Sequence, residues 1–207
     1  MEQFLLVISI TLLASMSPGP DFILVTKNNL LHGLKAGIIT SIGVGLGVLV
    51  HVIYCIAGLG LIISKSILLF NIIKIAGALY LLYLAYMLMK SKKQDTNLEI
   101  KNKEIQKKSN LKFLTEGFLG NALNPKATIF FLSVFTQIID IKTPIITQML
   151  LGLSMMGVVG TWFILLSFLL NLKFIKNKIS SIQYIVEKIM GGLLAFVGIK
   201  IILDTSN

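Results

Sequence analysis

The chain has 207 residues, of which 55% are hydrophobic and 14% are charged, and its mean hydropathy is +0.86. These values exclude an ordinary soluble domain, whose surface is covered by polar residues. The formal net charge of +10 would suit a nucleic-acid-binding protein, but all 19 basic residues are lysine, whereas planar recognition of phosphates and bases favours arginine. We therefore expect an integral membrane protein that does not bind nucleic acid.

A helix that spans a bilayer needs about 20 apolar residues. The chain offers six such stretches and leaves little sequence for a domain outside the lipid bilayer: Phe4–Val25, Gly37–Ile63, Ile67–Met89, Phe113–Ile139, Thr147–Leu170 and Ile182–Leu203. The predicted fold class is an all-α integral membrane protein with six transmembrane helices, forming a single membrane domain over 1-207.

The first stretch is interrupted by the motif Ser17-Pro18-Gly19-Pro20-Asp21. A proline inside a bilayer helix frees a backbone carbonyl that lipid cannot satisfy, so such a break persists only where it packs on protein or lines a wet cavity. Asp21 lies past the midplane of this stretch, where a charge is costly and functional by default. Two roles are open for Asp21: handling of a substrate or proton, and capping of the helix that resumes after Pro20.

Small residues recur at helical spacing, which allows helix backbones to approach closely in lipid. They form two stripes on the second stretch and continue at single positions of the third and sixth: Gly33, Gly37, Ser41 and Gly45; Gly43 and Gly47; Gly77; and Gly191. We expect these residues to serve packing within the chain. The same stripes would also suit a helix that slides during transport or the seam of a homodimer.

His51 follows Gly47 by four residues and so shares its helical face, away from lipid. The titration range of histidine suits a proton relay, and a histidine satisfied by a neighbouring carbonyl is the plainer alternative. Cys55 is the single cysteine, which excludes an intramolecular disulfide and a paired-thiol relay and indicates a small buried apolar residue. Because the two histidines, the cysteine and the acids form no cluster with metal-ligand spacing, we expect no metal and no cofactor.

The polar stretch 90-112 is rich in lysine, and lysine-rich short loops stay in the cytoplasm. Its eight lysines and six others make fourteen on the inner side when the stretches are counted outward from this loop, against four on the outer side. The six are Lys27, Lys35, Lys173, Lys176, Lys178 and Lys188, and the four are Lys65, Lys74, Lys142 and Lys200. Both termini are therefore predicted outside.

The two halves resemble an inverted duplication. Lys74–Leu79 and Lys188–Leu193 share four of six residues, and Ser17-Pro18 corresponds to Asn124-Pro125, 107 residues later. Three spans per half is an odd number, so the second half must enter the membrane in the opposite direction. The predicted division is a first three-helix repeat, a basic cytoplasmic linker and a second three-helix repeat: 1-89, 90-112 and 113-207.

The fourth stretch is broken at Asn124-Pro125-Lys126, so a second proline and a second charge lie near the middle of the membrane. Paired broken helices in corresponding positions of two halves indicate the binding site of a secondary transporter. Free N–H groups where a half-helix starts favour an anion such as a carboxylate, a buried Asp can bind an ammonium group or take a proton, and Asn124 can both donate and accept. Asp21, Asn124 and Lys126 thus form a candidate cradle for a zwitterion. Lys126 has two other open roles: pairing with Asp21, and capping of carbonyls freed by Pro125.

Four motifs of the chain resemble those of the LysE/RhtB family, bacterial inner-membrane exporters of amino acids and related metabolites. The motifs are Ser17-Pro18-Gly19-Pro20-Asp21, His32-Gly33-x-Lys35-Ala36-Gly37, Gly77-Ala78-x-Tyr80-Leu81 and Asn124-Pro125-Lys126-Ala127. The resemblance implies efflux of lysine-, homoserine- or threonine-like solutes across the bacterial cytoplasmic (inner) membrane, driven by the proton gradient. The family often has Pro-Gln-Phe after the fourth helix, where this chain reads Thr136-Gln137-Ile138, so the role of Gln137 is left open.

The leading interpretation is a secondary transporter, and not an enzyme, that exports amino acids or small amino-acid derivatives by proton antiport. A passive channel and a membrane-embedded enzyme or redox protein of similar fold are the alternatives. Buried charges at broken helices favour alternating access over a channel, and a thiol relay needs two cysteines. The residues do not select the amino acid, the coupling stoichiometry or the oligomeric state.

Overall fold

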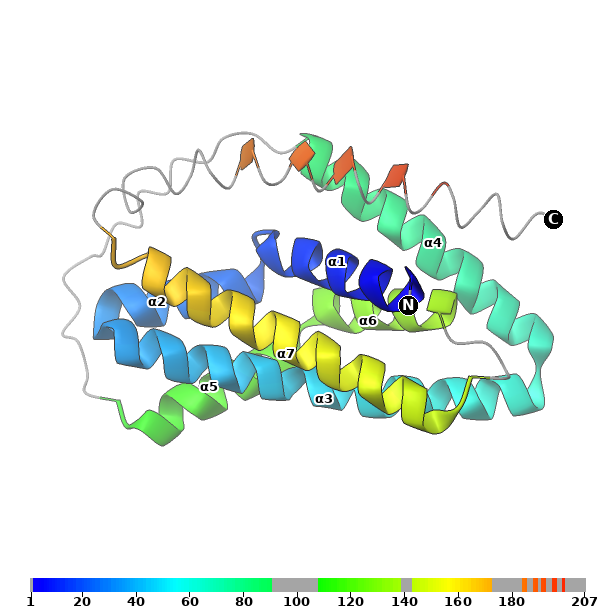
Figure 1. The fold of residues 1–207 in the computed structure, drawn as a ribbon, viewed down its shortest axis with the longest axis horizontal. Helices are drawn as coiled ribbons and strands as arrows, with labels where there is room; N and C mark the ends of the chain where they lie inside the picture. Colours follow the sequence, from blue (N-terminus) through cyan, green and yellow to red (C-terminus); the bar gives the residue numbers. More distant parts are fainter. Residues whose placement is uncertain are drawn as a thin grey trace.

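The computed structural model describes residues 2–90, 108–138 and 143–172, together with a few residues between 184 and 199. All regular structure in these residues is helical, in the order shown in Figure 1. The helices are α1 (Glu2–Met16), α2 (Pro20–His32), α3 (Leu34–Lys65), α4 (Ile67–Lys90), α5 (Asn110–Ala122), α6 (Pro125–Ile138) and α7 (Ile145–Leu169).

Three of these helices, α3, α4 and α7, are long and apolar enough to cross a bilayer. Helices α1 and α2 together make a fourth such unit, bent by 58° at the first break. Large apolar side chains such as Ile53, Leu68 and Ile145 are more than 60% exposed, as expected for residues that face lipid. The described residues therefore account for up to four membrane-crossing units, and the chain is a multi-pass membrane protein.

The helices agree with most of the expected stretches, with two differences in their bounds. The first stretch does not end at Val25, because α2 continues to His32. The fourth stretch consists of two helices, α5 and α6, which meet at the second break. The linker 90-112 and the sixth stretch lie largely outside the described residues, so the six-helix inverted repeat remains a prediction.

Helix α3 contacts five other helices: α2, α4, α5, α6 and α7. Figure 1 shows α7 running alongside α3, while α1 packs on α7 and α4 packs on α6. This arrangement brings the two breaks together in the interior, since side chains of residues 17 and 126 are hydrogen-bonded to each other.

One small-residue stripe of α3 faces α5. A methyl group added to Gly43 would lie 2.2 Å from the carbonyl oxygen of Leu114, and one added to Gly47 would lie 2.8 Å from that of Phe118. Gly117 on α5 is equally close to the carbonyl of Thr40 on α3. The two backbones are therefore in direct contact, which only residues without a side chain allow.

The other stripe of α3 faces α7. Gly45 lies against Gly160, Gly37 against Ser167, and the hydroxyl oxygens of Ser41 and Ser167 are 3.3 Å apart. Both stripes thus pack against other helices of the same chain. Gly33 does not belong to this contact: its φ of 87° makes it the left-handed residue that ends α2, and no atom lies within 4 Å of an added methyl group.

The two other glycines also lie at helix contacts. An added methyl group on Gly77 of α4 would meet the Cα of Ser133 on α6 at 2.9 Å. One on Gly191 would meet the carbonyl oxygen of Ala85 on α4 at 3.0 Å.

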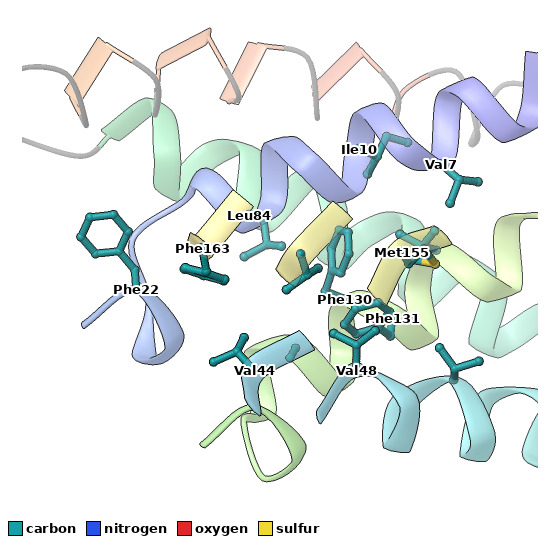
Figure 2. Close-up of a cluster of buried hydrophobic side chains, with 14 of the residues drawn as sticks. Val7, Ile10, Phe22, Val44, Val48, Leu84, Phe130, Phe131, Met155 and Phe163 are labelled. Carbon is teal, nitrogen blue, oxygen red and sulfur yellow. The ribbon is translucent and has the colours of Figure 1, made fainter. Parts of the chain in front are cut away.

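The buried core lies between the helices and is drawn in Figure 2. Val44 and Val48 of α3 face Phe130 and Phe131 of α6 there, and Phe163 comes from α7. This apolar cluster includes Phe22 and Ala127, which directly follow Asp21 and Lys126 of the two breaks.

Candidate functional site

The first break ends α1 and begins α2 within three residues. Pro20 is the first residue of α2, where the missing N–H of proline costs nothing, and Gly19 is the N-cap, with no side-chain capping bond. Asp21 therefore lies in the first turn and is not the N-cap, which corrects the capping role considered for it. A carboxylate is favourable at this end of a helix dipole.

The second break is built in the same way, with Pro125 as the first residue of α6. Here a side chain does cap the helix: Asn124 Oδ1 accepts a hydrogen bond of 3.0 Å from the backbone N–H of Lys126. The carbonyl of Asn124 accepts from the N–H of Thr128 at 2.9 Å. The amide Nδ2 of Asn124 takes no part in this cap and can donate to another residue.

The two breaks satisfy each other's polar groups. Asp21 Oδ2 accepts from Asn124 Nδ2 at 3.0 Å and from Asn121 Nδ2 at 2.9 Å. In return, Lys126 Nζ donates to Ser17 Oγ at 2.8 Å and to the carbonyl of Pro18 at 3.1 Å. Lys126 thus caps a carbonyl of the first break, whereas the sequence had suggested carbonyls freed by Pro125.

Gly19 makes room for this lysine. A methyl group added to Gly19 would lie 3.2 Å from Lys126 Nζ, closer than an ordinary van der Waals contact. The absence of a side chain at this position therefore lets the ammonium group reach the backbone of the first break.

A cavity of about 60 Å³ lies between the two breaks. It exceeds the ~10–15 Å³ that one water molecule requires. Its polar lining comes from the two breaks and the helix ends beside them, and its apolar lining comes largely from α2, α4, α6 and α7. The polar residues are Ser15, Ser17, Asp21, Asn121, Asn124 and Lys126, and the apolar ones include Phe22, Leu84, Leu88, Phe130, Phe131, Val159 and Phe163.

Asp21 retains an unused acceptor in this setting. Its Oδ1 is buried and has no hydrogen-bond partner among the described residues, although Oδ2 has two. A buried acceptor without a donor is unfavourable. The carboxylate is therefore able to accept a further donor, such as an ammonium group, or a proton.

His51 is fully buried and lies behind Asn121, not on the cavity wall. Its Nε2 is 2.9 Å from the carbonyl oxygen of Asn121, and its Nδ1 is 2.6 Å from the hydroxyl of Tyr54. The ring stacks on Phe131 at 5.2 Å between centroids. His51 is thus hydrogen-bonded to a neighbouring carbonyl. Asn121 links it to Asp21, because its backbone bonds to His51 and its side chain bonds to Asp21.

The sequence argument missed two residues of this site, Asn121 and Tyr54. Asn121 precedes Asn124 by three residues, a spacing that would place both on one face of an unbroken helix, and this was the available signal. Tyr54 stands in the same relation to His51. Gln137, at the end of α6, is half-buried and does not line the cavity. Within the described residues, no group of three or more His, Cys, Asp or Glu could hold a metal ion.

Comparisons with known proteins agree with this architecture. The model of the LysE type translocator family matches residues 12–205. The chain is 32% identical over 208 residues to the uncharacterized membrane protein YrhP of Bacillus subtilis, covering 97% of this chain and 98% of the relative. It is 31% identical over 205 residues to the threonine efflux protein of Escherichia coli K12, with the same coverage.

A third relative, the threonine efflux protein of Salmonella typhimurium, is 30% identical over 208 residues and 99% of both chains. No solved structure matches the chain significantly. The family match spans the two breaks, and the resemblance inferred from their motifs is confirmed. The chain belongs to the LysE type translocator family and is a membrane transporter, not an enzyme.

Proposed function

We propose that this transporter exports amino acids or small amino-acid derivatives from the cytoplasm, with protons as the coupling ion. Two of the relatives that match nearly the whole chain are named threonine efflux proteins, which supports a substrate of the same class. The cavity between the breaks supports the same conclusion on chemical grounds.

The observation that carries the proposal is that one cavity is lined by a carboxylate and an ammonium group from two different breaks. An amino acid is a zwitterion, so its ammonium group suits the free acceptor Oδ1 of Asp21. Its carboxylate suits Lys126 together with the N–H groups that begin α2, which lack a side-chain cap. The aromatic and aliphatic part of the lining suits a substrate side chain of limited polarity.

Coupling to protons follows from the same carboxylate. A protonated Asp21 no longer attracts an ammonium group, so protonation and substrate occupancy exclude each other at this position. Entry of a proton from outside would therefore favour a site without substrate, and release of that proton inside would restore affinity for the next substrate. This order of proton binding and substrate release is proton antiport.

We place the protein in the bacterial cytoplasmic membrane with both termini outside, as six helices in two inverted repeats. The lysine distribution supports this orientation. In a Cys55→Ser background, a cysteine at Thr143 should react with a membrane-impermeant maleimide applied to whole cells, and one at Ser109 should not. The reverse pattern would contradict the orientation.

Efflux from cells loaded with mixed dipeptides tests the function and identifies the substrate. Cells with the wild-type protein should release one or a few amino acids faster than cells without it, and Asp21→Asn should abolish the difference at matched expression. Ser9→Ala is the control, because the Ser9 hydroxyl bonds only within α1 and is exposed. Normal transport and an unchanged response to a pH gradient in Asp21→Asn would refute the role of Asp21.

A further inference from the structure

The hydrogen bonds around His51 define its neutral form. The carbonyl oxygen of Asn121 can only accept, so the Nε2 that faces it must carry the hydrogen. In a neutral ring Nδ1 is then an acceptor, and the hydroxyl of Tyr54 donates to it at 2.6 Å. The other neutral tautomer would place two acceptors against each other, so it is excluded by this geometry.

The same contacts also accommodate a protonated ring. With a hydrogen on Nδ1, the ring donates to the oxygen of Tyr54. The Tyr54 hydrogen is then released toward the carbonyl of Thr128, which lies 3.4 Å away. Every donor keeps an acceptor after this exchange, so a buried imidazolium is left with no unsatisfied N–H.

The two carbonyls involved lie on either side of the second break. Asn121 belongs to α5, and Thr128 belongs to the first turn of α6. In the neutral form the short hydrogen bond from His51 joins α3 to α5, and the contact from Tyr54 to the α6 carbonyl is long, at 3.4 Å; in the protonated form the Tyr54 hydroxyl donates fully to that carbonyl. Asn121 also donates to Asp21. Protonation of His51 therefore acts on the same break that positions the Asp21 carboxylate.

We propose that His51, with Tyr54 as its positioning residue, is a second proton-binding site whose occupancy ties α3 to both sides of the α5–α6 break. This inference rests on the proposed coupling to protons; it develops the proton relay considered for His51 from the sequence and adds Tyr54, which the sequence argument missed. Binding moves one proton onto Nδ1 and turns the Tyr54 hydroxyl from Nδ1 to the Thr128 carbonyl, with no other bond made or broken.

The other titratable groups near the ring are few. Asp21 on α2 acts on His51 electrostatically, and Lys126 on α6 acts on Asp21. Helix α3 itself supplies Tyr54 and Cys55, and α4 supplies Tyr80, whose hydroxyl bonds to the carbonyl of Lys126. The segment of α5 that packs here presents Asn121, and α7 contains no titratable side chain. Loss of the Asp21 charge should therefore also make proton binding to His51 weaker.

The direct test is ¹⁵N NMR of histidine-labelled protein in nanodiscs, in a His32→Gln background that leaves His51 as the single histidine. The neutral ring should carry its hydrogen on Nε2 and should gain a second on Nδ1 as the pH falls. Tyr54→Phe leaves that N–H without an acceptor, so it should lower the titration midpoint by about one pH unit or more. Tyr80→Phe removes an equivalent hydroxyl that does not touch His51, and should leave the midpoint unchanged.

Three results would overturn the inference: a neutral tautomer with hydrogen on Nδ1, a ring that stays neutral down to pH 5, or equal midpoints in Tyr54→Phe and Tyr80→Phe. Efflux measured on the same variants separates this inference from the proposed function. A midpoint shift in a protein that exports no amino acid would refute the function and retain the proton site. Export that depends on Asp21, without a midpoint shift in Tyr54→Phe, would retain the proposed function and refute the proton site at His51.

Discussion

Asn121 connects the two titratable side chains of the site. Its side-chain amide donates to Asp21, and its backbone carbonyl accepts from His51. It is almost completely buried and its side chain lies against Gly47, where an added methyl group would come within 2.8 Å of it. The orientation of the carboxylate therefore depends on an uncharged residue that is itself fixed by close helix packing.

Asn121→Ala should lower the rate of export about tenfold or more, because a hydrogen bond to a charged group contributes ~1.5–3 kcal/mol and each 1.36 kcal/mol corresponds to a factor of ten. Initial rates of efflux at matched expression measure the effect. Asn110→Ala, an exposed position on the same helix, should behave as wild type. Equal rates for the two variants would show that Asn124 alone orients Asp21.

Asp21, Lys126 and Asn124 could be found from the sequence, whereas Asn121 and Tyr54 could not. Asp21 and Lys126 were identified because a charge inside the bilayer is costly and rarely occurs without a function. Asn121 and Tyr54 carry no such cost when they are paired. The pattern of polarity along α3 and α5 does not show which face meets which neighbour, so these residues were recognised only from the packing.

At the scale of helices, the two breaks and the glycine stripes occur at the same helix contacts. Pro20 and Pro125 begin new helices, and Lys126 of the second break satisfies a carbonyl of the first. Helix α5, which leads into the second break, lies directly on α3, and Gly43 and Gly117 permit this contact. The sequence predicted the breaks and the stripes separately, but it did not reveal which stripe faced which helix, because spacing alone cannot assign a partner.

Gly43→Ala should destabilise the folded protein by about 1–3 kcal/mol, the usual range for overpacking, because its methyl group would meet the Leu114 carbonyl at 2.2 Å. Reversible unfolding in mixed micelles measures this free energy. Gly58→Ala is the matched control on the same helix, since no atom lies within 4 Å of its added methyl group. That variant should be as stable as wild type or slightly more stable. An equal loss of unfolding free energy in Gly43→Ala and Gly58→Ala would contradict a tight contact between α3 and α5 at Gly43.

At the scale of the molecule, the site lies where the two halves of the chain meet. Residues 17–21 and 121–126 are about a hundred positions apart in sequence, yet they share hydrogen bonds across one cavity. A site at the junction of two halves suits alternating access, because a movement of one half against the other would open the cavity to one side at a time. The six-helix inverted repeat fits this view but depends on the segment 182–203, which lies mostly outside the described residues.

The most direct test of this account is uphill transport by the purified protein in liposomes. Vesicles are loaded with the amino acid found in the cell assay, and an imposed pH gradient is the only source of energy. Wild type should move the amino acid against its concentration gradient while protons move the other way, and Asp21→Asn should do neither. Transport that only dissipates the amino-acid gradient, or that proceeds equally in Asp21→Asn, would contradict proton-coupled export through the paired breaks and would favour a passive channel.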